Sequence, residues 1–286
     1  MNLIIKNNKL ISCKCIESSH VTIPDNVKSI GDDAFQEFKK VHARLYNEDI
    51  KDSKCLRTVS LHNGITSIGR NAFAYCHELI EIEVPEKVVL LKNGVFYGCT
   101  ALQKVTLPKG LKKLEGNAFA LCSSLRDITL PPDLLELGSW VFHKTPIEEI
   151  VLPDRITEIK EAAFYYCTYL KVITFPKFLT RILRLAFSHC SSLKEIILPD
   201  RIMYIGPSAF SNCDSLERVV IPNGVNKIAS QTFAFCKKLA CVELPDTIIE
   251  IEKDAFMYSE NVVIKAPYGS YAIQYAKENS IKHEVI

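Results

Sequence analysis

The chain has 286 residues, of which 48% are hydrophobic and 24% are charged, a composition that fits one large or two ordinary folded domains. Its 35 basic and 33 acidic residues give a net charge of +2 and are interleaved along the sequence, which disfavours nucleic acid and anionic membranes as partners. No stretch approaches the roughly 18 consecutive apolar residues that a membrane-spanning helix needs.

The amino-terminal residues 1–24 are predicted to form a cap of short strands. Two apolar segments, 3–5 and 10–11, flank the polar turn 7–8, a pattern typical of a hairpin. The first apolar run is too short for the hydrophobic region of a signal peptide. The sequence therefore predicts a cytoplasmic protein, and the alternative is a cell-surface or secreted protein whose leader precedes this sequence.

Ten phenylalanines mark a repeat that occupies residues 25–266. After the first interval they are 23 residues apart, with one step of 22. They are Phe35, Phe73, Phe96, Phe119, Phe142, Phe164, Phe187, Phe210, Phe233 and Phe256. A period between 20 and 50 residues indicates a solenoid, in which each unit buries its apolar face against its neighbours.

Each repeat begins with a predicted strand. In one of them, Val105 and Leu107 alternate with Lys104 and Thr106, which is the period of a half-buried strand. Pro108 follows at once and ends the strand, because proline has no N–H for the ladder.

The remainder of each repeat returns the chain to the next strand. Leu111 and Leu114 predict a second short segment that faces inward, and Phe119 leads through a short helical or 3₁₀ turn to Cys122. We therefore expect about ten coils of 22–23 residues, stacked into a curved parallel sheet with these turns on its convex side.

The cysteines follow the same repeat. Seven of the eleven lie three residues after a repeat phenylalanine, where stacked equivalent side chains favour buried packing over disulfides. Cys13 and Cys15 lack a second pair at ligand spacing, which disfavours zinc. An odd number of thiols, most of them unpaired, favours a reducing compartment.

The carboxy-terminal residues 267–286 are predicted to form a second cap. An amphipathic helix follows Gly269, with Ser270 as its N-cap, and a last strand ends the chain. Tyr271 and Tyr275 share one face of this helix, and contact with the core is favoured over stacking on a ligand.

The repeat has a recognisable consensus, L-x-x-I-x-L-P-x-x-L-x-x-I-x-x-x-A-F-x-x-C, which residues 193–213 illustrate. This pattern resembles the BspA-type leucine-rich repeat, also called the Treponema pallidum type. The resemblance implies an α/β fold of the leucine-rich-repeat class, a horseshoe-like solenoid. It also implies a function in binding, because bacterial and protist members are often surface or secreted proteins implicated in adhesion to host proteins.

The strand face that points away from the core is the first candidate binding surface, on the concave side. Apolar residues there are rimmed by charges, as at many protein interfaces, although strand propensity alone also explains exposed β-branched residues. The candidates are Glu149, Val151, Val172, Thr174, Glu195, Ile197, Arg218 and Val220.

Two irregularities of the repeat supply further candidates. Around the short step after Phe142, an apolar patch on the convex edge is one interpretation and local repacking is the other. The insertion at about 39–54 is either a binding loop or a tolerated surface excursion. The candidates are Trp140, Leu185, Tyr165 and Tyr166 on the edge, and His42, Arg44 and Tyr46 in the insertion.

The sequence favours a binding protein over an enzyme. Its seven histidines are scattered, and no nucleophile, metal-ligand or phosphate-loop motif accompanies them. We therefore predict a non-enzymatic scaffold for protein–protein interaction, without cofactor or metal and without membrane insertion. The sequence does not determine the oligomeric state, for which a monomer is favoured. The alternative function is a cell-surface or released adhesin that binds host or extracellular proteins.

Overall fold

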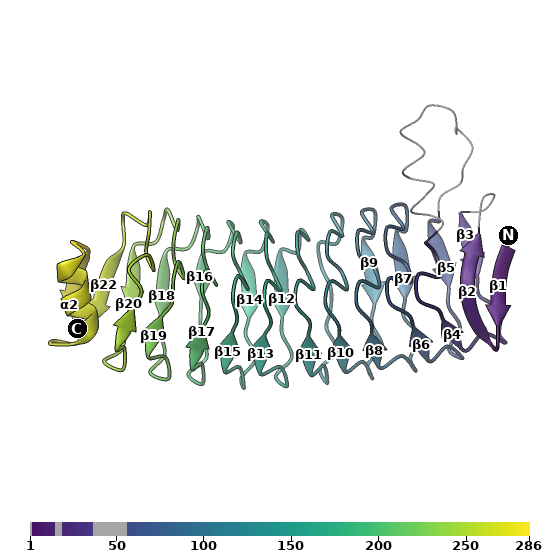
Figure 1. Cartoon of the computed structure of the whole chain (residues 1–286), viewed down its shortest axis with the longest axis horizontal. Coiled ribbons are helices and arrows are strands. Elements are labelled where there is room, and N and C mark those ends of the chain that lie inside the picture. The colour runs from purple at the N-terminus through teal and green to yellow at the C-terminus, as the bar shows by residue number, and fades with distance from the viewer. Residues whose placement is uncertain (1, 15–18, 37–55) are drawn as a thin grey trace, which may run out of the picture. The chain divides into compact units, whose positions relative to one another are not determined.

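The computed structural model describes residues 2–14, 19–36 and 56–286. These residues form two compact units, 1–147 and 148–286, which are described in turn. The division falls at the step of 22 residues between Phe142 and Phe164. In both units, consecutive coils of the chain place equivalent strands side by side, as Figure 1 shows.

In the first unit, the predicted strands form a four-stranded parallel sheet of the order β3-β5-β7-β9. Its strands are β3 (His20–Thr22), β5 (Thr58–Ser60), β7 (Glu81–Glu83) and β9 (Lys104–Thr106). The middle residue of each is buried and its two neighbours point outward or are only partly buried, so the predicted alternation is confirmed.

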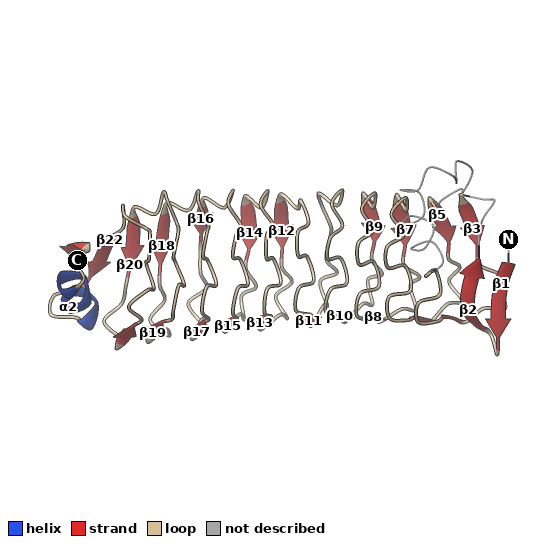
Figure 2. Ribbon diagram, turned by 45° about the horizontal axis from the view of Figure 1, so that its top comes forward, coloured by secondary structure: helices blue, strands red, loops and turns tan. Residues whose placement is uncertain are grey.

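The second inward segment of each coil forms a ladder of its own (Figure 2). The strands are β4 (Ser29–Ile30), β6 (Ser67–Ile68), β8 (Leu90–Leu91), β10 (Lys113–Leu114) and β11 (Glu136–Leu137). The predicted hairpin is also confirmed, because β1 (Asn2–Lys6) pairs antiparallel with β2 (Lys9–Lys14), which in turn pairs with β4. Its turn residues Asn7 and Asn8 both have positive φ, as a type I′ hairpin turn requires.

The second unit repeats this arrangement in shorter ladders. Strands of the first kind are β12 (Glu149–Val151), β14 (Val172–Thr174), β16 (Glu195–Ile196), β18 (Arg218–Val220), β20 (Cys241–Glu243) and β22 (Val263–Ala266). Strands of the second kind are β13 (Glu158–Ile159), β15 (Arg181–Ile182), β17 (Tyr204–Ile205), β19 (Lys227–Ile228) and β21 (Glu250–Ile251). All described pairs in this unit are parallel.

The carboxy-terminal segment contains the one α-helix among the described residues, α2 (Tyr271–Glu278), followed by β23 (Lys282–Val285), which pairs with β22. Ser270 is the N-cap residue, as predicted, but its side chain makes no capping hydrogen bond. Tyr275 is buried, with its hydroxyl 3.4 Å from the carbonyl oxygen of Glu252, whereas Tyr271 is 40% exposed. The expected core contact therefore holds for Tyr275.

The repeat phenylalanines form the centre of the core. Nine of the ten are fully buried, and successive rings stack face to face with centroids 4.5–5.8 Å apart within each unit. Backbone bonds run parallel to this stack, for example from Phe119 N–H to the Val141 carbonyl at 2.9 Å. The phenylalanine segment is thus a third hydrogen-bonded ladder beside the two sheets.

The leucine-rich-repeat solenoid is confirmed, but the turns around the phenylalanines are not the short helices or 3₁₀ turns that we expected. The residue two before most of these phenylalanines, and the residue two after, have φ between 48° and 68°. A left-handed residue on each side interrupts any helical run. The strain is tolerated because the ladder to the next coil fixes the backbone on both sides.

The repeat cysteines are buried and free, yet they do more than fill space. The thiol of Cys122 donates to the carbonyl oxygen of Phe96, in the preceding coil, at 3.1 Å. Cys99, Cys190, Cys213 and Cys236 make the same bond at 3.0–3.3 Å. Ser259, the serine at this position, donates to Phe233 at 2.7 Å.

Candidate functional site

The outward face of β12, β14, β16 and β18, with Ile197 at the end of β16, carries the largest apolar exposure that the sequence predicted. We call this surface the strand-face patch. Ile197 is 79% exposed, Val151 67%, Val172 50% and Val220 46%, although the alternate residues Ile150, Ile196 and Val219 are buried. Successive side chains of a strand point to opposite faces of the sheet, so these residues point away from the core. No described element of the second unit covers them.

Strand register places the predicted charges beside these apolar residues. Glu149 pairs with Val172, and Val151 pairs with Thr174. One strand further on, Glu195 pairs with Arg218. All eight predicted residues of this face are thus exposed, seven of them on four neighbouring strands of one unit and Ile197 directly after β16.

A salt bridge closes one edge of the strand-face patch. Arg218 Nη2 lies 2.6 Å from Oε1 of Glu243, which is paired with Val220 across β18 and β20. Glu243 therefore balances the charge of Arg218 at this edge. Both side chains remain accessible to a partner.

The equivalent face of the first unit is polar. There, His20 Nδ1 lies 2.7 Å from Oγ1 of Thr58, and its Nε2 lies 3.2 Å from Oγ of Ser60. Glu81 and Lys104 follow on the next strands and help to line a hollow of about 470 Å³. The two units therefore present chemically different strand faces.

The predicted edge residues fall in both units. Tyr165 and Tyr166 pack edge to face at 4.7 Å, and His189 of the next coil stacks on Tyr166 at 4.0 Å. Burial lowers the pKa of His189, against the opposing effect of Asp214, which favours the neutral form of this ring. Leu185 is partly buried, and Trp140, in the first unit, packs edge to face on His143 at 5.2 Å.

The remaining predictions concern the insertion, metals and membranes. His42, Arg44 and Tyr46 lie outside the described residues. Within residues 2–14, 19–36 and 56–286, no cluster of His, Cys, Asp and Glu could hold a metal ion. In the same ranges, no helix has the length and hydropathy to cross a membrane.

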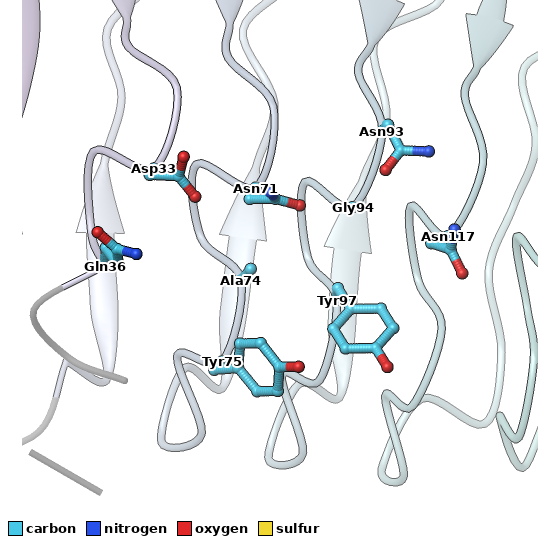
Figure 3. Close-up of a pocket in the computed structure, with 9 residues that line it drawn as sticks. All are labelled: Asp33, Gln36, Asn71, Ala74, Tyr75, Asn93, Gly94, Tyr97 and Asn117. Carbon is cyan, nitrogen blue, oxygen red and sulfur yellow. The ribbon is translucent and has the colours of Figure 1, made fainter. Parts of the chain in front are cut away.

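A groove in the first unit was not predicted from the sequence. It encloses about 420 Å³ and is lined by residues of four consecutive coils (Figure 3). The lining residues are Asp33, Gln36, Asn71, Ala74, Tyr75, Asn93, Gly94, Tyr97 and Asn117. Up to 84 residues of sequence separate them. The one signal in the sequence is that they occupy equivalent positions in successive repeats.

Fold and core together define a leucine-rich-repeat protein. The family model for the BspA type leucine rich repeat region matches residues 4–52, 43–170 and 136–263, and the chain belongs to this family. The resemblance that the repeat consensus suggested is thereby confirmed. Curated protein sequences give no significant match to the chain.

Several solved structures share the fold. A leucine-rich repeat protein from Bacteroides ovatus is 28% identical, with a TM-score of 0.70 over 94% of this chain and 72% of that one. A leucine rich cell surface protein from Faecalibacterium prausnitzii is 21% identical, with a TM-score of 0.54 over 98% and 91%. The pneumococcal vaccine antigen PcpA is 19% identical, with a TM-score of 0.52 over 97% and 83%.

Proposed function

We propose that this chain is a non-catalytic scaffold that binds another protein through the strand-face patch. The observation that carries the proposal is the exposure of Ile197 and Val151, 79% and 67%, on the outward strand face, bordered by Glu149, Glu195 and Arg218. An apolar centre with a charged rim is the usual composition of a protein interface. The patch spans two hydrogen-bonded sheets, β12-β14 and the sheet that begins with β16, and these backbone bonds limit the conformational entropy that the strands lose on binding.

The test uses substitutions that the repeat itself tolerates. Val172→Glu plus Ile197→Glu places acidic residues where other coils already have Glu149 and Glu243, so the fold is expected to survive. The matched control is Thr106→Glu plus Thr129→Glu, which makes the same change of charge on the strand face of the first unit.

The three chains are immobilised and the proteins that they capture are quantified by mass spectrometry. We expect a partner that the wild type and the control retain and that the strand-face variant loses. With the isolated partner, the variant is expected to bind at least about 30-fold more weakly, which corresponds to about 2 kcal/mol. Equal retention by all three chains, with unchanged thermal melting, contradicts the proposal.

A second candidate function is adhesion at the cell surface, with a partner outside the cell. It is supported by the family and by the structural similarity to the Faecalibacterium leucine rich cell surface protein. Labelling of intact native cells with a membrane-impermeant biotin reagent separates this candidate from the cytoplasmic scaffold. Labelling of the chain, with a cytoplasmic marker unlabelled, supports the adhesin, and an unlabelled chain supports the scaffold.

A further inference from the structure

The groove of Figure 3 is built on the left-handed positions of the repeat. Asp33, Asn71, Gly94 and Asn117 each lie two residues before a repeat phenylalanine, with φ between 50° and 64°. Their backbone N–H groups donate to the next coil at 2.9–3.0 Å. Strands of adjacent coils lie about 4.8 Å apart, so these positions form a row with one residue per coil. Three coils place a polar side chain in this row, and the coil with Gly94 leaves a gap.

Two glycines keep the groove open. A Cβ atom on Gly94 would collide with Oδ1 of Asn71, and a Cβ atom on Gly98 would lie 2.9 Å from the ring of Tyr75. Both glycines belong to the same coil and both have positive φ. This coil therefore leaves space that Asn71 and Tyr75, from the preceding coil, occupy.

The amides of the groove have unused hydrogen-bonding capacity. Among the described residues, the side-chain amides of Asn71, Asn93 and Asn117 form no hydrogen bond with the protein. Each amide offers two N–H donors and a carbonyl acceptor in one plane. Tyr75 and Tyr97 border the amides, with their rings edge to face and 5.2 Å apart (Figure 3).

The lining excludes several kinds of ligand. Among the described residues that line it there is no Lys, Arg or His, which disfavours phosphates and other anions, and Asp33 is the one acidic residue, too few carboxylates for a metal ion. An extended peptide cannot add a strand here, because the backbone N–H groups of the row are already bonded.

We propose that this amide groove binds a neutral carbohydrate. Planar amides that can both donate and accept match adjacent sugar hydroxyls, and the tyrosine rings offer apolar surface to the C–H faces of the sugar. The regular step between coils suits a ligand that is itself a linear repeat, such as an oligosaccharide. This site is distinct from the strand-face patch and does not depend on the proposed protein partner.

The second unit shows that the groove is a local feature and not a general property of the repeat. At the same left-handed positions it has Ala162, Leu185, Ser208 and Gln231. Aromatic side chains follow in both units, as Phe235 packs on Tyr258 at 4.8 Å, so the difference lies in the left-handed positions.

These natural differences supply the variants. Asn71→Leu plus Asn117→Leu removes two amides, and Leu185, with φ of 59°, shows that the backbone accepts leucine at this position. Gly94→Ala fills the groove, and Ala162 supports the backbone conformation of that variant. The matched control is Ser208→Leu plus Gln231→Leu, which makes equivalent changes outside the groove.

Binding is measured by titration calorimetry of the full chain with cellotetraose, chitotetraose, maltotetraose and mannotetraose, and with tetragalacturonate as an acidic probe. We expect at least one neutral tetrasaccharide to bind, and the double leucine variant to bind it about tenfold or more weakly, with Gly94→Ala also weakened and the control unchanged. Undiminished binding by both groove variants overturns the proposal. So does equal binding of the acidic probe, or no binding of any neutral probe tighter than about 1 mM.

Discussion

At the scale of single residues, the cysteine column shows what the repeat requires at this position. Most coils have a small side chain here that donates a hydrogen bond, since Ser259 makes the same bond to a phenylalanine carbonyl that Cys122 does and Thr145 donates to Phe142 in its own coil. We had interpreted the position as one of packing alone. A buried, bonded thiol is also poorly accessible to oxidants, so the odd number of cysteines is weaker evidence for a reducing compartment than we had inferred.

The thiols predict how stability depends on pH. Burial raises the pKa of Cys122 and of Cys236 from 9.0 to about 12, because a thiolate is poorly solvated in the core. Between these values the unfolded chain releases protons that the folded chain keeps. The contribution of these thiols to the free energy of unfolding is therefore complete below pH 9 and is lost as pH rises towards 12.

Urea unfolding at intervals from pH 9 to about 12 measures this loss. Cys122→Ser plus Cys236→Ser keeps the hydrogen-bond donor without a titrating thiol, so its stability is expected to fall less steeply than that of the wild type. Parallel curves for the two chains would show that other groups cause the alkaline loss.

At the scale of elements, the sequence predicted the longer strands and the cap helix better than the turns. Val105 and Pro108 were sufficient to place a strand and its end, because alternation and a missing N–H act locally. The ladder of strands such as β10 was not predicted, since two residues are too short to show a period. Positive φ at Ala162 and Leu185 was not predictable either, because contacts with the adjacent coil enforce a conformation that these residues rarely adopt.

The cap helix predicts an unusual response to a capping substitution. An N-cap serine ordinarily contributes about 0.5–2 kcal/mol, but Ser270 makes no capping bond and its Oγ is buried without a partner. We expect Ser270→Ala to change the free energy of unfolding by less than about 0.5 kcal/mol, or to stabilise the chain.

Ser259→Ala is the control for this measurement. Ser259 Oγ accepts from Cys236 N–H at 2.9 Å and donates to the carbonyl of Phe233, so its loss is expected to cost about 1–3 kcal/mol. Urea unfolding monitored by circular dichroism compares the two variants. A cost for Ser270→Ala as large as that for Ser259→Ala would contradict the absence of a capping bond.

At the scale of the whole molecule, each coil is stabilised chiefly by its immediate neighbours. Phe187 and Phe210 stack with ring centroids 5.4 Å apart, whereas Phe164 and Phe233 are three coils apart in the same unit. Each Phe→Ala substitution is expected to cost about 3–5 kcal/mol. In double-mutant cycles, the stacked pair is expected to show a coupling of about 0.5–3 kcal/mol and the distant pair to be additive.

Chemical unfolding of the single and double variants measures both couplings. A coupling between Phe164 and Phe233 as large as that between Phe187 and Phe210 would show that the packing of one coil extends beyond its immediate neighbours, and would contradict the nearest-neighbour description.

The two candidate surfaces differ in how far the sequence could predict them. Strand-face residues such as Val172 and Ile197 follow from alternation, so their exposure was predictable from each strand alone. The amide groove was not, because Asn71 becomes available only when Gly94 in the next coil leaves room for it. Both surfaces combine residues of several coils, so the sequence of one repeat does not determine which surface binds a partner.

The left-handed positions tolerate asparagine, glycine, tryptophan, alanine, leucine, serine and glutamine in one chain, while the phenylalanine two residues later never varies. Recognition and folding are therefore separable in this architecture. Mutation can alter this edge one coil at a time without disturbing the stacked rings beneath it, so a lineage can acquire new specificities while retaining its scaffold. For the same reason, the edge offers protein engineers a row of adjustable positions on an otherwise invariant core.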